Sequence, residues 1–310
     1  MAGETKSKIL VIAASGGLGK LLVEESVKYG HPTFALFRQS ALGDPLKAQI
    51  AAEFRAQGVT VLVGGVDDYD SLLNAVKQVD IVLSAVGAQQ LGDQGGIIDA
   101  IKEAGNVKRF VPSDYGFLLD SKRVIEPIKT ISGQKRGFRR KVQESGIPYT
   151  FVNSNFCGSL IFPTLAPPGS TDFPPRDRIA VYGDQNLKGV FNEERDIATY
   201  TILAVDDPRA LNTVVYIQPE KNIISYGDLA ALWEEKIGKK LERVHVTEED
   251  IFETLPKLEI PLNILLSINY SVFVKGDQSF FQVPPEWVEA SELYPHVKYT
   301  SVEAHLEKFV

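Results

Sequence analysis

Short apolar runs alternate with helical patterns through the first half of the chain. The runs are KILVIA, TFALF, VTVLVG, DIVLSAV, KRFVPS and PYTFVN, with amphipathic segments between them. Runs that recur about every 20 to 30 residues with intervening helices predict a parallel, doubly wound sheet, because parallel neighbours need a helical crossover. We therefore expect an α/β Rossmann fold whose ligand lies at the carboxyl ends of the strands.

The regular alternation stops after Asn153. The segment PTLAPPGSTDFPPRDR contains five of the 17 prolines in the chain, and the segments beyond it are mixed in type. This pattern predicts a smaller α+β region packed over the edge of the sheet. We expect a dinucleotide-binding Rossmann domain over residues 1–154 and a mainly substrate-binding domain over 155–310, with room for segments that return to the Rossmann sheet. A substrate pocket is expected between the two parts.

Composition and charge limit the classes of function. The 310 residues carry a net charge of −7 with a pI near 5.3, which argues against a nucleic-acid binder because such proteins need a basic face. No run approaches the roughly 20 apolar residues of a membrane helix, and the amino terminus does not resemble a signal peptide. One cysteine and four scattered histidines offer neither a disulfide nor a metal site. We expect a cytoplasmic protein, monomer or homodimer, without nucleic acid, membrane or metal partners.

A turn rich in small residues follows the first apolar run. In ILVIAASGGLGKLLVEE, the dinucleotide fingerprint G-x-G-x-x-G places its glycines at Ala14, Gly16 and Gly19, and two of these three are glycines. Gly16 lets the backbone approach a pyrophosphate, and Gly19 lets helix and strand pack closely. Ser15 and Gly17 keep the loop small, so the helix start still faces an anion. Its place in the first strand of the series favours a cofactor loop over an ordinary strand-to-helix turn.

The end of the second run indicates which dinucleotide binds. TFALFRQS contains Arg38, no acidic residue follows it before Asp44, and Lys47 comes soon after. An NAD site usually places an acid here to hold the ribose 2′-hydroxyl, whereas a 2′-phosphate needs a cation. A guanidinium engages phosphate in bidentate fashion, so the sequence favours NADPH over NADH. A solvated surface arginine is the alternative interpretation.

Two lysines are candidates for acid–base chemistry. The Tyr-x-x-x-Lys pattern of conventional short-chain dehydrogenases occurs only as YPHVK, Tyr294 to Lys298, where Pro295 disfavours a helix. Lys135, in SGQKRGFRRKVQESGIPYTFV, lies on the helix that leads into the strand whose end should face the nicotinamide. Burial and neighbouring cations would lower its pKa toward that of a general base. From composition alone, a solvated lysine in a basic run is the more ordinary interpretation.

Many ordered segments carry a resemblance to a known family. They are KILVIAASGGLGK, GHPTFALFR, IKEAGNVKRFVPSDYG, RRKVQESGIPYTFV, FNEERDIATYT, VDDPRALN, LWEEKIGK, SVFVKGD and EASELYPHVKYT, and they run from about Lys6 to Val310. Together they resemble the plant isoflavone reductase-like family of atypical, NmrA-like short-chain reductases. That family includes phenylcoumaran benzylic ether reductases, pinoresinol-lariciresinol reductases and eugenol synthases, and the segments do not single out one of them.

The resemblance implies an NADPH-binding Rossmann domain, a C-terminal substrate domain and hydride transfer to a phenylpropanoid-derived aromatic substrate. It also implies a lysine base at Lys135, which would deprotonate a substrate phenol and help form a quinone-methide-like hydride acceptor. The expected cofactor site comprises Ala13, Ser15, Gly16, Gly17, Leu18, Gly19, Arg38, Lys47, Ala85, Val86, Gly87, Ser113, Lys135, Asn155 and Phe156. The expected substrate site comprises Tyr115, Phe156, Cys157, Leu160, Tyr270 and Phe273.

The chain departs from the family pattern at several of these positions. Ala13 and Ala14 replace the two leading glycines of the family loop GGTGYIG, and PSEFG becomes PSDYG. The family's NCF appears as NFC, so a pocket aromatic is expected at Phe156, and Tyr270 replaces a histidine common before SVF. The first departure bears on cofactor affinity, and the others bear on the identity of the substrate.

The leading hypothesis is an NADPH-dependent reductase of a small aromatic plant metabolite. One alternative is a dinucleotide-sensing regulator that binds NADP without turnover. Another is an enzyme redirected to a different substrate, such as an alkaloid. Lys135 favours an enzyme, whereas the loss of glycine at Ala13 and Ala14 gives the regulator some weight.

Overall fold

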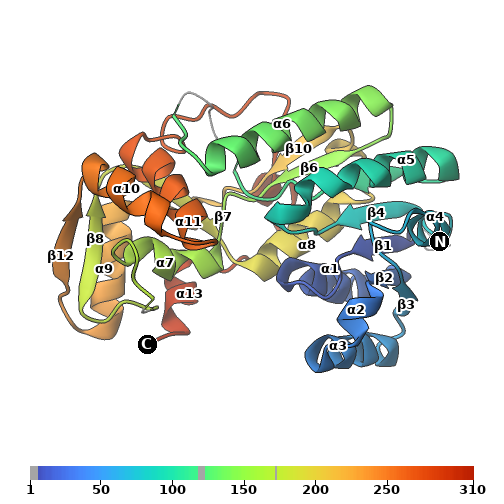
Figure 1. Ribbon diagram of the computed structural model, residues 1–310, viewed down its shortest axis with the longest axis horizontal. Helices are drawn as coiled ribbons and strands as arrows, with labels where there is room; N and C mark the ends of the chain where they lie inside the picture. The colour runs from blue at the N-terminus through green and yellow to red at the C-terminus, as the bar shows by residue number, and fades with distance from the viewer. Residues whose placement is uncertain (1–5, 118–122, 172) are drawn as a thin grey trace.

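A parallel sheet forms the core of the larger half of the molecule (Figure 1). The computed structural model of the chain describes residues 6–117, 123–171 and 173–310. The first five strands are β1 (Ile9–Ile12), β2 (Thr33–Phe37), β3 (Thr60–Val63), β4 (Ile81–Ser84) and β5 (Arg109–Val111). They pair in the order β3-β2-β1-β4-β5, and every pair is parallel. The expected α/β Rossmann fold is confirmed.

Later segments of the chain extend this parallel arrangement. The strands concerned are β6 (Thr150–Asn153), β10 (Thr213–Tyr216) and β13 (Val288–Glu289). They pair in parallel in the order β13-β10-β6, and a parallel bridge between Phe110 and Tyr149 connects β6 to the edge of β5. Residues after 154 therefore build the far edge of the sheet as well as the second half of the molecule.

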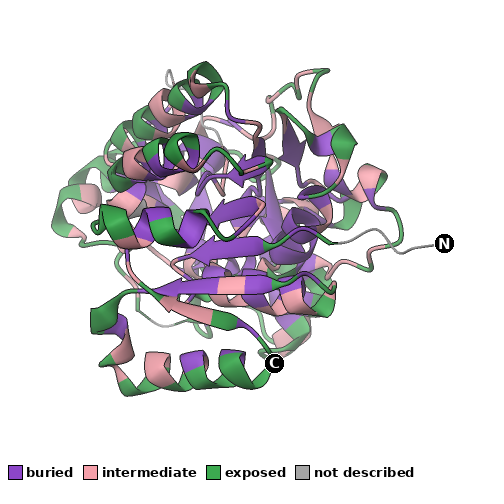
Figure 2. Ribbon diagram, turned by 90° about the vertical axis from the view of Figure 1, so that its right-hand side faces the viewer, coloured by how far each residue is buried: buried purple, intermediate pink, exposed green. Residues whose placement is uncertain are grey.

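Helices cover both faces of the sheet. One face packs against α1 (Gly17–Lys28), α3 (Pro45–Ala56) and α8 (Glu194–Ala204), and the other against α4 (Tyr69–Val76), α5 (Gly95–Ala104) and α6 (Ile128–Ser145). Alternate residues of β1 join the two cores, with Ile9 and Val11 in one and Leu10 and Ile12 in the other. Figure 2 shows these strands as buried purple ribbons enclosed by helices with exposed outer faces. Burial on both faces explains why the strands are continuously apolar.

The second half of the molecule lies beside the sheet, at the left of Figure 1. Its strands are β7 (Phe156–Cys157), β8 (Arg178–Tyr182), β9 (Lys188–Asn192), β11 (Ile223–Ser225) and β12 (Glu242–Val246), paired as β11-β9-β7 and β12-β8. Its helices are α7 (Ile161–Leu165), α9 (Tyr226–Ile237), α10 (Glu248–Thr254), α11 (Leu262–Asn269) and α13 (Val302–Glu307). They enclose a separate apolar core that contains Phe191, Tyr226 and Trp233.

Short helical segments complete the chain. They are α2 (Gln39–Leu42), α12 (Ala290–Leu293), η1 (Ala88–Gln94), η2 (Gly158–Leu160), η3 (Pro208–Ala210), η4 (Glu220–Asn222), η5 (Leu255–Lys257) and the π-helical turn η6 (Tyr270–Val274). Across the ranges that the structure describes, no helix combines the length and apolar character needed to cross a membrane. Nor do the same ranges bring together three His, Cys, Asp or Glu side chains that could hold a metal ion.

Candidate functional site

The turn between β1 and α1 is built for close backbone contact. Gly16 is the N-cap residue of α1, and no side chain caps the first amides of this helix. An added Cβ at Gly19 would lie 2.2 Å from the carbonyl oxygen of Ala13, so only glycine fits there. The amide of Gly16 donates to the same carbonyl oxygen at 3.1 Å. The uncapped amides at the helix start make this turn a site for an anionic group such as a pyrophosphate.

Ala13 carries the left-handed conformation of this turn. Its φ is 61°, whereas Ala14 has no positive φ and is 0% exposed. The backbone strain caused by the missing glycine is therefore at Ala13. It is not at Ala14, where the fingerprint places its first glycine. An alanine in this region costs roughly 1–2 kcal/mol, yet the turn keeps its hydrogen bond and its packing on Gly19.

Two cations lie near this turn without an acidic partner. Arg38 follows β2 as the N-cap residue of α2, and Lys47 lies in the first turn of α3. Asp44 caps α3 by accepting from the amides of Leu46 and Lys47 at 2.9 and 3.2 Å. Among the residues that the structure describes, no carboxylate forms an ion pair within 4.0 Å with either cation. Two cations of this kind beside an uncapped helix fit a ligand that carries phosphate groups.

These groups surround a cavity of about 290 Å³ at the carboxyl ends of the first strands. The structure places nine of the expected cofactor residues on its wall, namely Ala13, Ser15, Gly16, Gly17, Arg38, Lys47, Ala85, Val86 and Gly87. Gly64 and Gly65 also line it and were not expected. A signal for them existed, since both follow an apolar run at the edge where parallel strands end. An added Cβ at Gly65 would lie 3.1 Å from Cγ of Arg38, so the arginine stem packs closely on this glycine.

A second cavity of about 380 Å³ adjoins the first. Ala85, Val86 and Gly87 line both cavities, so the two form one continuous cleft. The expected residues on the second wall are Leu18, Ala85, Val86, Gly87, Ser113, Tyr115, Lys135, Asn155, Phe156, Cys157 and Leu160. The unexpected ones are Leu91, Gly116, Phe117, Ile128, Ile131, Ile264, Ile268 and Gln278. This wall is largely apolar and combines residues from the sheet edge, α6 and α11, as a pocket for a small aromatic molecule requires.

Lys135 is fixed on the wall of the second cavity by the loop after β5. Its Nζ donates a hydrogen bond to the carbonyl oxygen of Tyr115. Gly116 has a φ of 103°, and an added Cβ there would lie 3.3 Å from Nζ, so this glycine gives the amine room. Burial lowers the pKa of Lys135; the carboxylate of Asp114 opposes that shift, and Arg139 adds to it.

The other polar side chains on the wall of this cavity include those of Tyr115, Cys157, Ser113 and Asn155. Burial raises the pKa of the Cys157 thiol to about 12 and raises the pKa of the Tyr115 hydroxyl as well, so both stay protonated near neutral pH. Ser113 donates from Oγ to the carbonyl oxygen of Val86 at 2.7 Å and so ties the ends of β4 and β5 together. Asn155 accepts at Oδ1 from Nε2 of Gln278 at 3.2 Å.

Three expected site residues line neither cavity. Gly19 acts through its packing against Ala13. Tyr270 is buried in η6, and its hydroxyl donates to Glu248 at 3.1 Å. Phe273 is fully buried, and its ring stacks on Phe156, with ring centroids 6.0 Å apart. Tyr270 and Phe273 therefore lie in the core behind the wall, and their assignment to substrate stays a prediction. Tyr294 is the residue directly after α12, and residues 294–298 form no helix. The expectation that Pro295 disfavours a helix in YPHVK is therefore confirmed.

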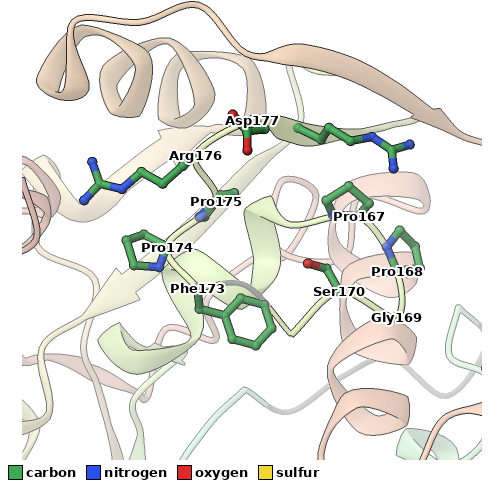
Figure 3. Close-up of a pocket in the computed structure, with 10 residues that line it drawn as sticks. Pro167, Pro168, Gly169, Ser170, Phe173, Pro174, Pro175, Arg176 and Asp177 are labelled. Atoms are coloured by element: carbon green, nitrogen blue, oxygen red, sulfur yellow. The ribbon is translucent and has the colours of Figure 1, made fainter.

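A larger hollow of about 820 Å³ is lined by the proline-rich segment of residues 167–170 and 173–178 (Figure 3). Phe173 and Arg176 point in different directions from this loop. Arg176 donates to the carbonyl oxygen of Phe309 at 2.7 Å and stacks over Trp233, and Asp177 pairs with Lys239 at 2.6 Å. Its charged groups are thus already partnered. The smaller cleft, with its glycine turn, unpaired cations and half-buried lysine, is the candidate functional site.

Fold and cleft together define a dinucleotide-binding protein of the Rossmann type with an adjoining cavity for a small apolar ligand. The chain belongs to the NmrA-like family, whose family model matches residues 5–306. It is 53% identical over 306 residues to phenylcoumaran benzylic ether reductase Betv6 of Betula pendula, which covers 98% of this chain and 99% of the relative. It is also 53% identical over 308 residues to eugenol synthase 2 of Clarkia breweri, which covers 99% of each.

A solved structure agrees with this assignment. The binary complex of leucoanthocyanidin reductase and NADPH from Vitis vinifera is similar with a TM-score of 0.87 and 33% identity, covering 97% of this chain and 98% of that chain. The resemblance to the isoflavone reductase-like family is therefore confirmed.

Proposed function

We propose that the chain is an NADPH-dependent oxidoreductase that reduces a small aromatic, phenylpropanoid-type substrate with Lys135 as the general base. The oxidoreductase class and the cofactor follow from the family, since a close relative is named a reductase and a solved relative holds NADPH. The identity of the substrate does not, because relatives with different names are equally similar. The observation that carries the proposal is the position of Lys135 on the wall of an apolar cavity that opens into the cofactor cavity.

The residues of the cleft fit NADPH. The uncapped start of α1 would hold the pyrophosphate, and Arg38 with Lys47 would hold the 2′-phosphate. Ala85, Val86 and Gly87 line the passage between the cavities, where the reacting end of the cofactor would meet the substrate. When bound, NADPH supplies the hydride.

Lys135 has the surroundings that a general base requires. Burial lowers its pKa, which increases the fraction of neutral amine near physiological pH. The hydrogen bond to the carbonyl oxygen of Tyr115 fixes the amine on the cavity wall. The lone pair of the neutral amine would take the phenolic proton of the substrate. The electron pair left on the phenolate would then expel an oxygen leaving group from the benzylic carbon, and the quinone-methide-like species that forms would accept the hydride at that carbon.

The remaining wall of the cavity supports this division of roles. Ile131, Ile264 and Ile268 offer an apolar surface to an aromatic ring, whose burial also keeps water from the reacting atoms. The raised pKa values of Tyr115 and Cys157 leave both groups protonated near neutral pH. Lys135 is thus the proton acceptor that we assign to this cavity.

The test is the rate of the Lys135→Ala variant with NADPH and a panel of lignans, phenylpropanoid esters, isoflavones and imines. The rate is expected to fall by roughly 100- to 10,000-fold with little change in NADPH affinity, the range of general acid–base catalysis. Lys135→Arg should not rescue the rate, because a guanidinium stays protonated. Lys141→Ala, which removes an exposed lysine from the same helix, is the matched control and should keep the wild-type rate.

Other outcomes would change the assignment. A fully active Lys135→Ala protein that still binds NADPH would eliminate Lys135 as the base. Tight NADPH binding without turnover of any member of the panel would favour the dinucleotide-sensing regulator. A monomeric or homodimeric state and a cytoplasmic location stay predictions, which light scattering and fractionation would test.

A further inference from the structure

A buried ion pair joins α6 to the loop that follows β5. Nε of Arg139 donates to Oδ2 of Asp114 at 2.5 Å, and Nη2 lies 2.5 Å from the same oxygen. The two side chains are only 11% and 3% exposed, and contacts this short are typical of ionised partners. The guanidinium also stacks over the rings of Phe151 and Trp287, at 4.9 and 5.7 Å from their centroids. Arg139 is therefore held from several sides at this position.

Each member of the ion pair is a near neighbour of Lys135, Arg139 on the helix and Asp114 on the loop. Lys135 and Arg139 are four residues apart on α6 and so share one face of the helix. Asp114 directly precedes Tyr115, whose carbonyl oxygen accepts the hydrogen bond from Nζ of Lys135. The loop and the helix are thus joined at two adjacent points, one through the Asp114 side chain and one through the Tyr115 backbone.

The same loop is fastened to the rest of the cleft. Ser113 donates to the carbonyl oxygen of Val86, and the amide of Gly116 donates to Oγ of Ser154 at 2.8 Å. Ser113 and Gly116 thus tie residues 113–116 to the chain that follows β4 and β6, and Asp114 between them pairs with Arg139. The ion pair and the hydrogen bond from Lys135 to Tyr115 both join α6 to this loop.

We propose that Asp114 and Arg139 are positioning residues for Lys135, which hold α6 against the loop and balance the charge around the amine. This inference rests on the proposed role of Lys135 as the general base. Neither residue lines the cavity, so both act through Lys135 and not on the substrate.

The charges that face Lys135 give the inference a distinctive consequence. They come from Asp114 on the loop, Arg139 on α6 and the Cys157 thiol on β7. The thiol stays neutral near pH 7, because burial raises its pKa to about 12. Asp114 favours the protonated amine and Arg139 disfavours it. Removing one charge leaves the other uncompensated, so the two single variants should move the pKa of Lys135 in opposite directions.

The experiment follows the acidic limb of the pH profile of kcat/KM in Asp114→Asn, Arg139→Gln and the double variant. The limb is expected to move to lower pH by about one pH unit in Asp114→Asn and to higher pH by a similar amount in Arg139→Gln, the effect of one nearby charge. The double variant should return close to the wild-type limb. Arg140→Gln removes the same charge from the adjacent exposed position and should leave the limb in place.

A second readout needs no substrate. The pH dependence with which an amine-reactive reagent labels Lys135, followed by mass spectrometry on the cofactor-free protein, reports the titration of Nζ directly. The same opposite movements are expected, and retained NADPH affinity in calorimetry shows that each variant is folded. If Asp114→Asn does not fold, adding it to Arg139→Gln must move the limb back to lower pH.

The outcomes separate the two proposals. Movement of both single variants in the same direction, or a loss of rate with no movement, would overturn the positioning role. The pH midpoint of Lys135 labelling can move as expected while the pH profile of kcat/KM has no acidic limb that is lost in Lys135→Ala. In that case the positioning role of the ion pair is supported and the proposed function fails. Asp114→Glu keeps the charge and should keep both profiles close to wild type.

Discussion

Replacing Ala13 by glycine is expected to stabilise the protein, whereas the same change at the adjacent Ala14 is expected to destabilise it. Ala13 has a φ of 61°, where its Cβ crowds the following carbonyl oxygen. Ala14 has no positive φ, and its methyl group is fully buried in the core beneath β1 and α1. Two adjacent and chemically identical substitutions therefore test the backbone geometry of the turn.

The expected changes in the free energy of unfolding follow from these surroundings. Release of the left-handed strain at Ala13 contributes roughly 1–2 kcal/mol. Glycine at this position also lowers the free energy of unfolding by roughly 0.5–1 kcal/mol, because the unfolded chain becomes more flexible. The net stabilisation is therefore between about 0 and 1.5 kcal/mol, with a central value of about 0.8 kcal/mol. At Ala14 no strain is released, and the loss of a buried methyl group adds roughly 0.8 kcal/mol to the glycine cost, for a total loss of about 1.5 kcal/mol.

Urea unfolding of the wild type and both variants without cofactor measures these changes. The midpoint should rise for Ala13→Gly and fall for Ala14→Gly, with the same dependence on urea in all three proteins. NADPH affinity should change little in Ala13→Gly, because Gly16 and the start of α1 are unaltered. A midpoint for Ala13→Gly that falls as far as that of Ala14→Gly would refute the reasoning, since it would mean that the turn is not strained at Ala13.

Three further predictions concern the cofactor site, the stability of the fold and the cavity. Arg38→Ala should weaken NADPH by about 10- to 150-fold and NADH much less, because a hydrogen bond to a charged group contributes roughly 1.5–3 kcal/mol; equal weakening in calorimetry would show a structural role. Burial raises the pKa of Asp196 from 3.8 to about 6, so its contribution to stability is present below about pH 4 and is lost as the pH rises through about 6. Asp196→Asn should therefore flatten the pH dependence of urea unfolding in this window, and an unchanged dependence would contradict the assignment. Ile268→Trp should raise the KM of an aromatic substrate without changing NADPH affinity. If the KM and the NADPH affinity change together, Ile268 lies outside the substrate cavity.

The gathering of residues around the first cavity could be predicted because they follow successive strands. Arg38 comes directly after β2, Ala85 after β4 and Ser113 shortly after β5. Parallel strands bring their carboxyl ends to one edge of the sheet, so order along the chain gives proximity in space. The exact position of the strain could not be predicted in this way. The spacing of the fingerprint points to Ala14, and only the backbone geometry shows that Ala13 has the positive φ.

The lining of the second cavity could be predicted less well. Ile264 and Ile268 reach the cavity from α11, far along the chain from Lys135, and an apolar helix residue carries no sign of whether it faces a cavity or the core. The same ambiguity affects Tyr270 and Phe273, which the family resemblance assigned to substrate and the structure places behind the wall. Lys135 could be selected only through that resemblance, because a lysine in a basic run is ordinarily solvated.

The return of β10 and β13 to the parallel sheet has a mechanical consequence. The segments that build the second half start and finish in strands of one sheet, so the chain crosses between the halves several times. A hinge that opened the cleft would have to bend all these crossings together, and not a single linker. We therefore expect the walls of the cavity around Lys135 to be stiff, so that the proposed substrate is selected by preformed shape. A change of substrate then calls for new wall side chains and not for a different degree of domain closure.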